Sequence, residues 1–126
     1  MSFLEGFEHI VREHVALAPY TTLGLGGPAR YFIEPSSERE LIGVVAACAH
    51  AGIPLRVIGG GSNLLIRESG FDGAVLSLSA PAFTTMSTDS ETVQCGGGAK
   101  LSHLISFCIG SSLAGLEHLV GLPGTV

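Results

Sequence analysis

The chain has 126 residues, of which 46% are hydrophobic, and a formal net charge of -5 at pH 7. This length suffices for one domain, or a compact part of one, with a real buried core. A single lysine and five arginines leave no basic stripe for a nucleic-acid backbone, and no uninterrupted apolar stretch reaches membrane-spanning length, so nucleic-acid binding and membrane insertion are excluded as functions.

The first fourteen residues mix acidic with apolar side chains. They lack the basic start, apolar core and small-residue cleavage site of a signal peptide, so a cytoplasmic protein is expected. Within this region, Leu4 to Val15 alternates apolar and charged residues at roughly helical spacing. This pattern predicts a short leading helix that packs on another element and ends before Pro19.

A β-α-β unit is predicted next. Residues 30–34 (RYFIE) are aromatic and β-branched and end at a proline, which indicates a strand. Ser37 and Glu40 form a capping-box pattern that starts a helix, and Gly52 is its expected end. The buried face of that helix is expected to carry residues at i, i+3, i+4 and i+7, namely Leu41, Val44, Val45 and Cys48.

Three further elements are predicted along the chain. Residues 54–58 (PLRVI) and 74–78 (AVLSL) read as strands, with a turn over 69–73 between them. Residues 82–95 read as a hairpin around a polar Asp89-Ser90 turn. Residues 100–112 repeat the helical spacing, with a buried face formed by Leu101, Leu104, Ile105 and Cys108.

The titratable residues show no metal or nucleophile pattern. Cys48, Cys95 and Cys108 are odd in number and lack metal-type spacing, so buried free thiols are expected. The five histidines are scattered, and neither HExxH nor GxxxxGK[ST] occurs, so no metal site and no P-loop is predicted. Ser62 lies in GGGSN rather than GxSxG, which makes it a poor nucleophile and a better hydrogen-bond donor.

Glycine-rich loops are the most informative feature. Residues 59–61 are three consecutive glycines behind an apolar strand, followed by short polar side chains. Successive backbone N–H groups in such a loop can form an anion site that suits the pyrophosphate of a dinucleotide, although a tight turn with no ligand is the open alternative. GLGGPA, residues 24–29, matches a Rossmann fingerprint by letter only, because no strand precedes it and Pro28 leads into a strand.

Five segments in order resemble the UDP-N-acetylenolpyruvoylglucosamine reductase family, also called UDP-N-acetylmuramate dehydrogenase. The resemblance reaches only the N-terminal part of that family, and the apolar ending GLPGTV predicts that further structure follows. The segments are TTLGLGGPARYFIEP (21–35), IPLRVIGGGSNLLI (53–66), GFDGAVLSL (70–78), GGGAKLSHLI (96–105) and LAGLEHLVGLPGTV (113–126).

The resemblance implies an α+β fold of the PCMH type, as in vanillyl-alcohol oxidase, in which FAD lies between two α+β subdomains. The first subdomain is then expected over about 17–78, and the second over 79–126, incomplete and without the substrate-binding domain. Two sets of residues match the FAD-contacting segments of the family: Gly59, Gly60, Gly61, Ser62 and Asn63 in the first, and Gly121, Pro123, Gly124, Thr125 and Val126 in the second.

The resemblance also implies an activity: NADPH reduces FAD, and the flavin passes hydride to the enolpyruvyl double bond of a UDP-sugar, forming UDP-N-acetylmuramate for peptidoglycan and the cell wall. The catalytic serine, arginine and glutamate of the family lie downstream of the matched motifs, so no catalytic residue is assigned and this chain alone is expected to be inactive. Another FAD-dependent oxidase or dehydrogenase of the same fold, and a non-catalytic nucleotide-binding module, remain alternatives.

Overall fold

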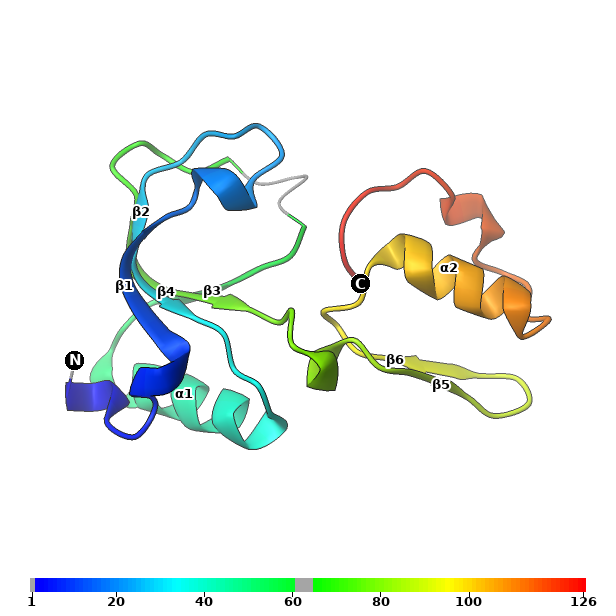
Figure 1. Ribbon diagram of the computed structural model, residues 1–126, viewed down its shortest axis with the longest axis horizontal. Helices are drawn as coiled ribbons and strands as arrows, with labels where there is room; N and C mark the ends of the chain where they lie inside the picture. The colour runs from blue at the N-terminus through cyan, green and yellow to red at the C-terminus, as the bar shows by residue number, and fades with distance from the viewer. Residues whose placement is uncertain (1, 61–64) are drawn as a thin grey trace.

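The computed structural model describes residues 2–60 and 65–126, and two parts lie side by side in it (Figure 1). The sheet part, residues 2–77, holds a four-stranded sheet with strand order β1-β2-β4-β3 and the helix α1. The hairpin part, residues 81–126, holds the pair β5-β6 and the helix α2. The bounds are β1 Val11–Ala16, β2 Pro28–Ile33, α1 Glu38–Ala51, β3 Leu55–Ile58, β4 Phe71–Ser77, β5 Met86–Thr88, β6 Val93–Cys95 and α2 Leu101–Gly110.

The predicted β-α-β unit is confirmed. Strands β2 and β3 run parallel to β4, which lies between them. Strand β4 begins earlier than the strand predicted over 74–78, because Phe71 to Gly73 belong to β4 and not to a turn. The register between β2 and β4 shifts by one residue between Ala29 and Tyr31, so the added residues of β4 enter the sheet through a bulge.

The predicted leading helix is wrong. Residues 11–16 form β1, which pairs antiparallel with β2 from Val11 opposite Ile33 to Ala16 opposite Pro28. The preceding residues form two 3-10 turns, Ser2–Leu4 and Glu8–Ile10. The helical spacing of the apolar residues favours a helix only weakly. Hydrogen bonding of residues 11–16 to the open edge of β2 outweighs this preference.

The start of α1 follows the predicted cap with one change. Ser37 Oγ accepts a hydrogen bond from the Glu40 N–H at 3.2 Å, as a capping box requires. The Glu40 carboxylate, however, reaches back one residue further and accepts from both the N–H and the hydroxyl of Ser36, each at 2.7 Å, and contacts His9 Nε2 at 2.8 Å. The Ser36 N–H, then His9 and the Ser36 hydroxyl, lower the pKa of Glu40 to about 2.

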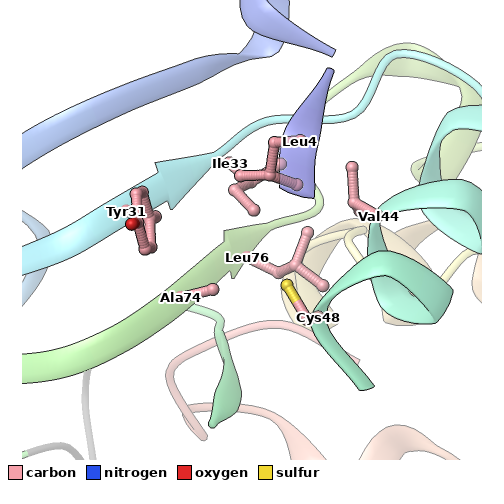
Figure 2. Packing of buried hydrophobic residues seen from close by; sticks show 7 residues of the cluster. All are labelled: Leu4, Tyr31, Ile33, Val44, Cys48, Ala74 and Leu76. Atoms are coloured by element: carbon pink, nitrogen blue, oxygen red, sulfur yellow. The ribbon is translucent and has the colours of Figure 1, made fainter. Parts of the chain in front are cut away.

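The main core lies between α1 and one face of the sheet, as Figure 2 shows. Val44 and Cys48 are buried as predicted, and burial raises the pKa of the Cys48 thiol. Val45 is 42% exposed, so its assignment to the buried face was wrong: the helix contacts the sheet along a stripe narrower than the sequence pattern. The cluster comprises Leu4, Tyr31, Ile33, Val44, Cys48, Ala74 and Leu76.

A second cluster lies on the other face of the same sheet. Alternate residues of a strand point to opposite faces, which places Phe32 and Val75 away from α1. The Tyr20 ring packs on Phe32 with 4.6 Å between ring centroids, and the Arg12 guanidinium lies 5.1 Å from the Phe32 centroid while donating to Tyr20 Oη. The Tyr20 ring and the Arg12 guanidinium, and not a helix, therefore pack on Phe32 at this face of the sheet.

The hairpin and the second helix are also confirmed. The Asp89 carboxylate closes the β5-β6 turn by accepting hydrogen bonds from the Thr92 hydroxyl, the Thr92 N–H and the Glu91 N–H, which lower its pKa. In α2, Leu104, Ile105 and Cys108 are buried, and Leu101 is partly exposed. Over residues 2–60 and 65–126, no helix has the length and apolar character to cross a membrane.

Substitution of two adjacent valines tests the packing of α1. Val44→Ala removes methyl groups from a fully buried site and is expected to lower the free energy of unfolding by about 2 kcal/mol. Val45→Ala, its control one residue away, is expected to change it by less than about 0.5 kcal/mol. Urea unfolding followed by circular dichroism measures both, and equal losses would contradict the assigned helix face.

Candidate cofactor-binding site

A hollow of about 230 Å³ lies where the two parts of the chain meet; we call it the central hollow. The ends of β3 and β4 form one wall, and the turn before α2 and the last residues of the chain form the other. In Figure 1 the C-terminal end returns to a position between the two parts. The lining residues are Val57, Ile58, Gly59, Ser77, Leu78, Ser79, Gly97, Gly98, Thr125 and Val126.

Two glycine-rich segments that are distant in the sequence come into contact beside the central hollow. Gly59 lies so close to Thr125 that a Cβ at Gly59 would collide with the Thr125 hydroxyl. A Cβ at Gly60 would lie 3.0 Å from the Cα of Gly124. The absence of a side chain at Gly60 thus allows two backbones to approach each other, and at Gly59 it leaves room for the Thr125 hydroxyl.

The position of Thr125 is fixed by an isolated antiparallel bridge to Lys100, at the start of α2. The Leu101 N–H donates to the Gly124 carbonyl at 3.0 Å, and the Val126 N–H donates to the Ala99 carbonyl at 2.9 Å. In this bridge pattern the N–H and C=O of Thr125 point away from Lys100. A single β-bridge thus holds the last residues beside the glycine loop.

Several backbone amides at this contact have no acceptor. Within the described ranges, the N–H groups of Gly59, Gly60 and Thr125 donate no hydrogen bond. Among the residues that the structure describes, no Asp, Glu, Lys or Arg lines the central hollow. Unpaired N–H groups around a concave site that lacks acidic side chains suit an anionic oxygen, so the residues present fit a phosphate or diphosphate group.

Most of the chain matches a known protein family. Residues 29–126 match the family described as "FAD binding domain". The chain belongs to this family. The fold is correspondingly the α+β FAD-binding fold, with its mixed four-stranded sheet and small two-stranded sheet.

Relatives of this FAD-binding domain are reductases. The chain is 44% identical over 124 residues to the UDP-N-acetylenolpyruvoylglucosamine reductase of Rhodopirellula baltica, covering 98% of the chain and 41% of the relative. It is 39% identical over 115 residues to the enzyme of that name from Thermobifida fusca, covering 90% of the chain and 32% of the relative. The chain is thus a homologue of the N-terminal FAD-binding part of these proteins.

A solved structure supports the same assignment. The crystal structure of UDP-N-acetylenolpyruvylglucosamine reductase (MurB) from Thermus caldophilus superposes with a TM-score of 0.72 at 36% identity. The match covers 92% of this chain and 40% of that one. The chain therefore spans about two fifths or less of the length of these relatives.

The structure brings together some of the predicted cofactor-binding residues of this FAD-binding domain and not others. Gly59, Thr125 and Val126 line the central hollow, and Gly60 and Gly124, which do not line it, lie close to each other. Gly121 and Pro123 do not line it; Gly121, with φ +92°, lies in the turn that precedes the final extended segment. Three further predicted residues, Gly61, Ser62 and Asn63, lie outside the described ranges.

Seven of the residues that line the hollow were not predicted as cofactor-binding residues. Three of them, Val57, Ile58 and Leu78, are apolar. The other four are Ser77, the last residue of β4, Ser79, two residues beyond it, and Gly97 and Gly98 from the second glycine triplet. That triplet was visible in the sequence, in front of a predicted helix, but its position against the first glycine loop depends on the fold.

The remaining polar chemistry near the site is limited. Cys95 precedes the second glycine triplet but does not line the central hollow; burial, with a contribution from Cys108, raises the pKa of its thiol. Among the described residues, no group of three His, Cys, Asp or Glu could hold a metal ion.

A larger hollow of about 430 Å³ lies on the face of the sheet opposite α1. Arg56 and Arg67 lie on its wall, and the Arg56 guanidinium is 5.8 Å from the Phe71 ring centroid. Val57 and Ile58 line both hollows, whereas none of the seven described residues predicted to contact FAD lines this one.

The contact between Gly59 and Thr125 can be tested by paired substitution. Gly59→Ala is expected to lower the free energy of unfolding by about 1–3 kcal/mol, because the new methyl group meets the Thr125 hydroxyl. Adding Thr125→Ala removes that atom and leaves the Thr125 Cβ at 3.6 Å, so most of the loss is expected to be recovered.

The matched control is Gly59→Ala with Thr125→Val, in which a methyl group replaces the hydroxyl and the collision persists. Urea unfolding of the variants measures the coupling between the two sites. Equal recovery by both double variants, or by neither, would contradict the contact.

Proposed function

We propose that this chain is part of the FAD-binding region of a cytoplasmic UDP-N-acetylenolpyruvoylglucosamine reductase and that the diphosphate of FAD binds in the central hollow. The observation that carries the proposal is the contact of Gly59 and Gly60 with Gly124 and Thr125, which leaves unpaired amides on both segments. Both segments also resemble FAD-contacting segments of the reductase family.

The proposal gives each side of the hollow a role. Residues of the first subdomain, about 17–78, would hold the diphosphate through the loop that begins at Gly59. Residues of the second, 79–126, would hold it through Thr125 and Val126. Gly61, Ser62 and Asn63, which continue the first segment, would extend the same site, and Gly121 and Pro123 would set the path of the second.

The full-length protein would catalyse the reaction for which the relatives are named. When bound, FAD supplies the hydride carrier between NADPH and the enolpyruvyl double bond of the UDP-sugar, which gives UDP-N-acetylmuramate for peptidoglycan. The residues described here bind and orient; none of them is proposed as a proton donor. The catalytic groups would belong to the three fifths of the relatives that this chain does not span, and the chain alone would be inactive.

Titration with two flavins tests the cofactor assignment. The chain is expected to bind FAD weakly but saturably, and at least about tenfold more tightly than riboflavin, a difference of about 1.4 kcal/mol. Riboflavin carries the same ring but lacks both the diphosphate and the adenosine of FAD, so the difference in affinity measures the contribution of these two groups together. Quenching of flavin fluorescence measures both affinities, and equal affinities would contradict a diphosphate site.

A chimera tests the reductase assignment. In the Rhodopirellula baltica enzyme, the matched region of 124 residues is replaced by this chain. The chimera is expected to retain FAD and to oxidise NADPH only when UDP-N-acetylglucosamine enolpyruvate is present, at a rate within about tenfold of the parent. Its control carries Gly59→Val and is expected to lose FAD. A folded chimera that keeps FAD but shows no turnover would favour another FAD-dependent enzyme of the same fold.

A further inference from the structure

The second glycine triplet, Gly96 to Gly98, contains two glycines that the fold itself requires. A Cβ at Gly96 would collide with the Phe83 carbonyl, and a Cβ at Gly98 would collide with the Leu78 carbonyl. Both residues therefore allow the turn before α2 to pass close to the backbone that links the two parts of the chain.

Gly97 lies between them, and no close backbone contact requires a glycine at this position. A Cβ at Gly97 would meet nothing within 4 Å, and its φ lies outside the left-handed range that favours glycine. Among the glycines whose surroundings the structure describes, only Gly110 shares both properties, and Gly110 ends α2 away from the central hollow. The chain's own packing thus leaves the small size of Gly97 unexplained.

Gly97 also has an amide that the turn does not use. The Gly96 N–H donates to the Thr85 carbonyl at 2.8 Å, the Gly98 N–H to the Phe83 carbonyl at 2.9 Å and the Ala99 N–H to the Gly96 carbonyl at 3.1 Å. The Gly97 N–H donates to no acceptor in residues 2–60 and 65–126. The N–H groups of the other three residues over 96–99 are all paired.

The space beside Gly97 belongs to the central hollow, which Gly97 lines together with Gly59 and Thr125. We propose that Gly97 is a further residue of the FAD diphosphate site and contributes room for a phosphate group and one backbone N–H. This inference rests on the proposed function and adds a third segment to it. The described lining residues include no lysine or arginine, so the donors available to stabilise a doubly charged group are backbone amides of several segments and the hydroxyl-bearing residues Ser77, Ser79 and Thr125.

The test compares Gly97→Val with Gly110→Val in the 126-residue chain, using FAD and riboflavin as probes. Both positions are exposed and free of contacts, so both variants are expected to fold, with thermal unfolding as the check. Gly97→Val is expected to weaken FAD binding at least about tenfold, because the isopropyl group fills the space of the phosphate. Gly110→Val is expected to stay within about twofold of the unmodified chain.

Each other outcome counts against a separate part of the proposal. If Gly97→Val binds FAD as the unmodified chain does, Gly97 is outside the site while the cofactor assignment stands. If riboflavin binding falls as much as FAD binding, Gly97 lies against the ring and not the diphosphate. If the unmodified chain binds no FAD, the cofactor assignment fails and this inference fails with it.

A smaller substitution separates folding from binding. Gly97→Ala adds a single methyl group where none meets a neighbour, so it is expected to keep the fold and to weaken FAD binding less than Gly97→Val does. Loss of the fold in both variants would show that the turn itself needs glycine at this position and would overturn the inference.

Discussion

The structure of the candidate site depends on one backbone contact, that of the final extended segment with the glycine loop after β3. The bridge between Lys100 and Thr125 holds the segment at the start of α2, and the absence of side chains at Gly59 and Gly60 lets it approach. Without this contact the sheet part and the hairpin part would each keep their own elements, but the unpaired amides of the two parts would not converge.

Recognition by main chain fits the composition of the protein. The chain carries a net charge of -5, and none of the residues described along the central hollow is a cation. A site made of N–H dipoles can still favour an anion at short range, because several donors point at one region and none brings an opposing carboxylate. The glycines serve this arrangement chiefly by allowing backbones to approach each other.

Local signals predicted much of the fold. The Ser37 cap, the Gly52 end of α1, the Asp89 turn and the spacing in α2 each combine a hydrogen-bonding or conformational requirement with hydrophobic periodicity, and these elements are confirmed. Strand β1 was not predicted, because its six residues show no strong strand pattern. They form a strand because they pair with the free edge of β2. Val45 was misplaced because periodicity gives the direction of a buried face but not its width.

The site could be predicted in part. Resemblance identified both segments that meet, but not Gly97 or Ser77, since proximity between a turn before α2 and the end of β4 follows from three-dimensional packing that no short motif encodes. Gly121 and Pro123 match the same motif but do not line the hollow, so their predicted contact with FAD stays a prediction.

The two parts of the chain have unequal internal support. Both identified hydrophobic clusters belong to the sheet part, whereas the hairpin part relies on the inner face of one ten-residue helix and on its bridge to the final segment. Local opening should therefore begin on the hairpin side, with the sheet persisting as the more slowly exchanging unit. A ligand that contacts both parts would stabilise them together, because its binding free energy is lost when either part opens. The two parts would then unfold as one cooperative unit.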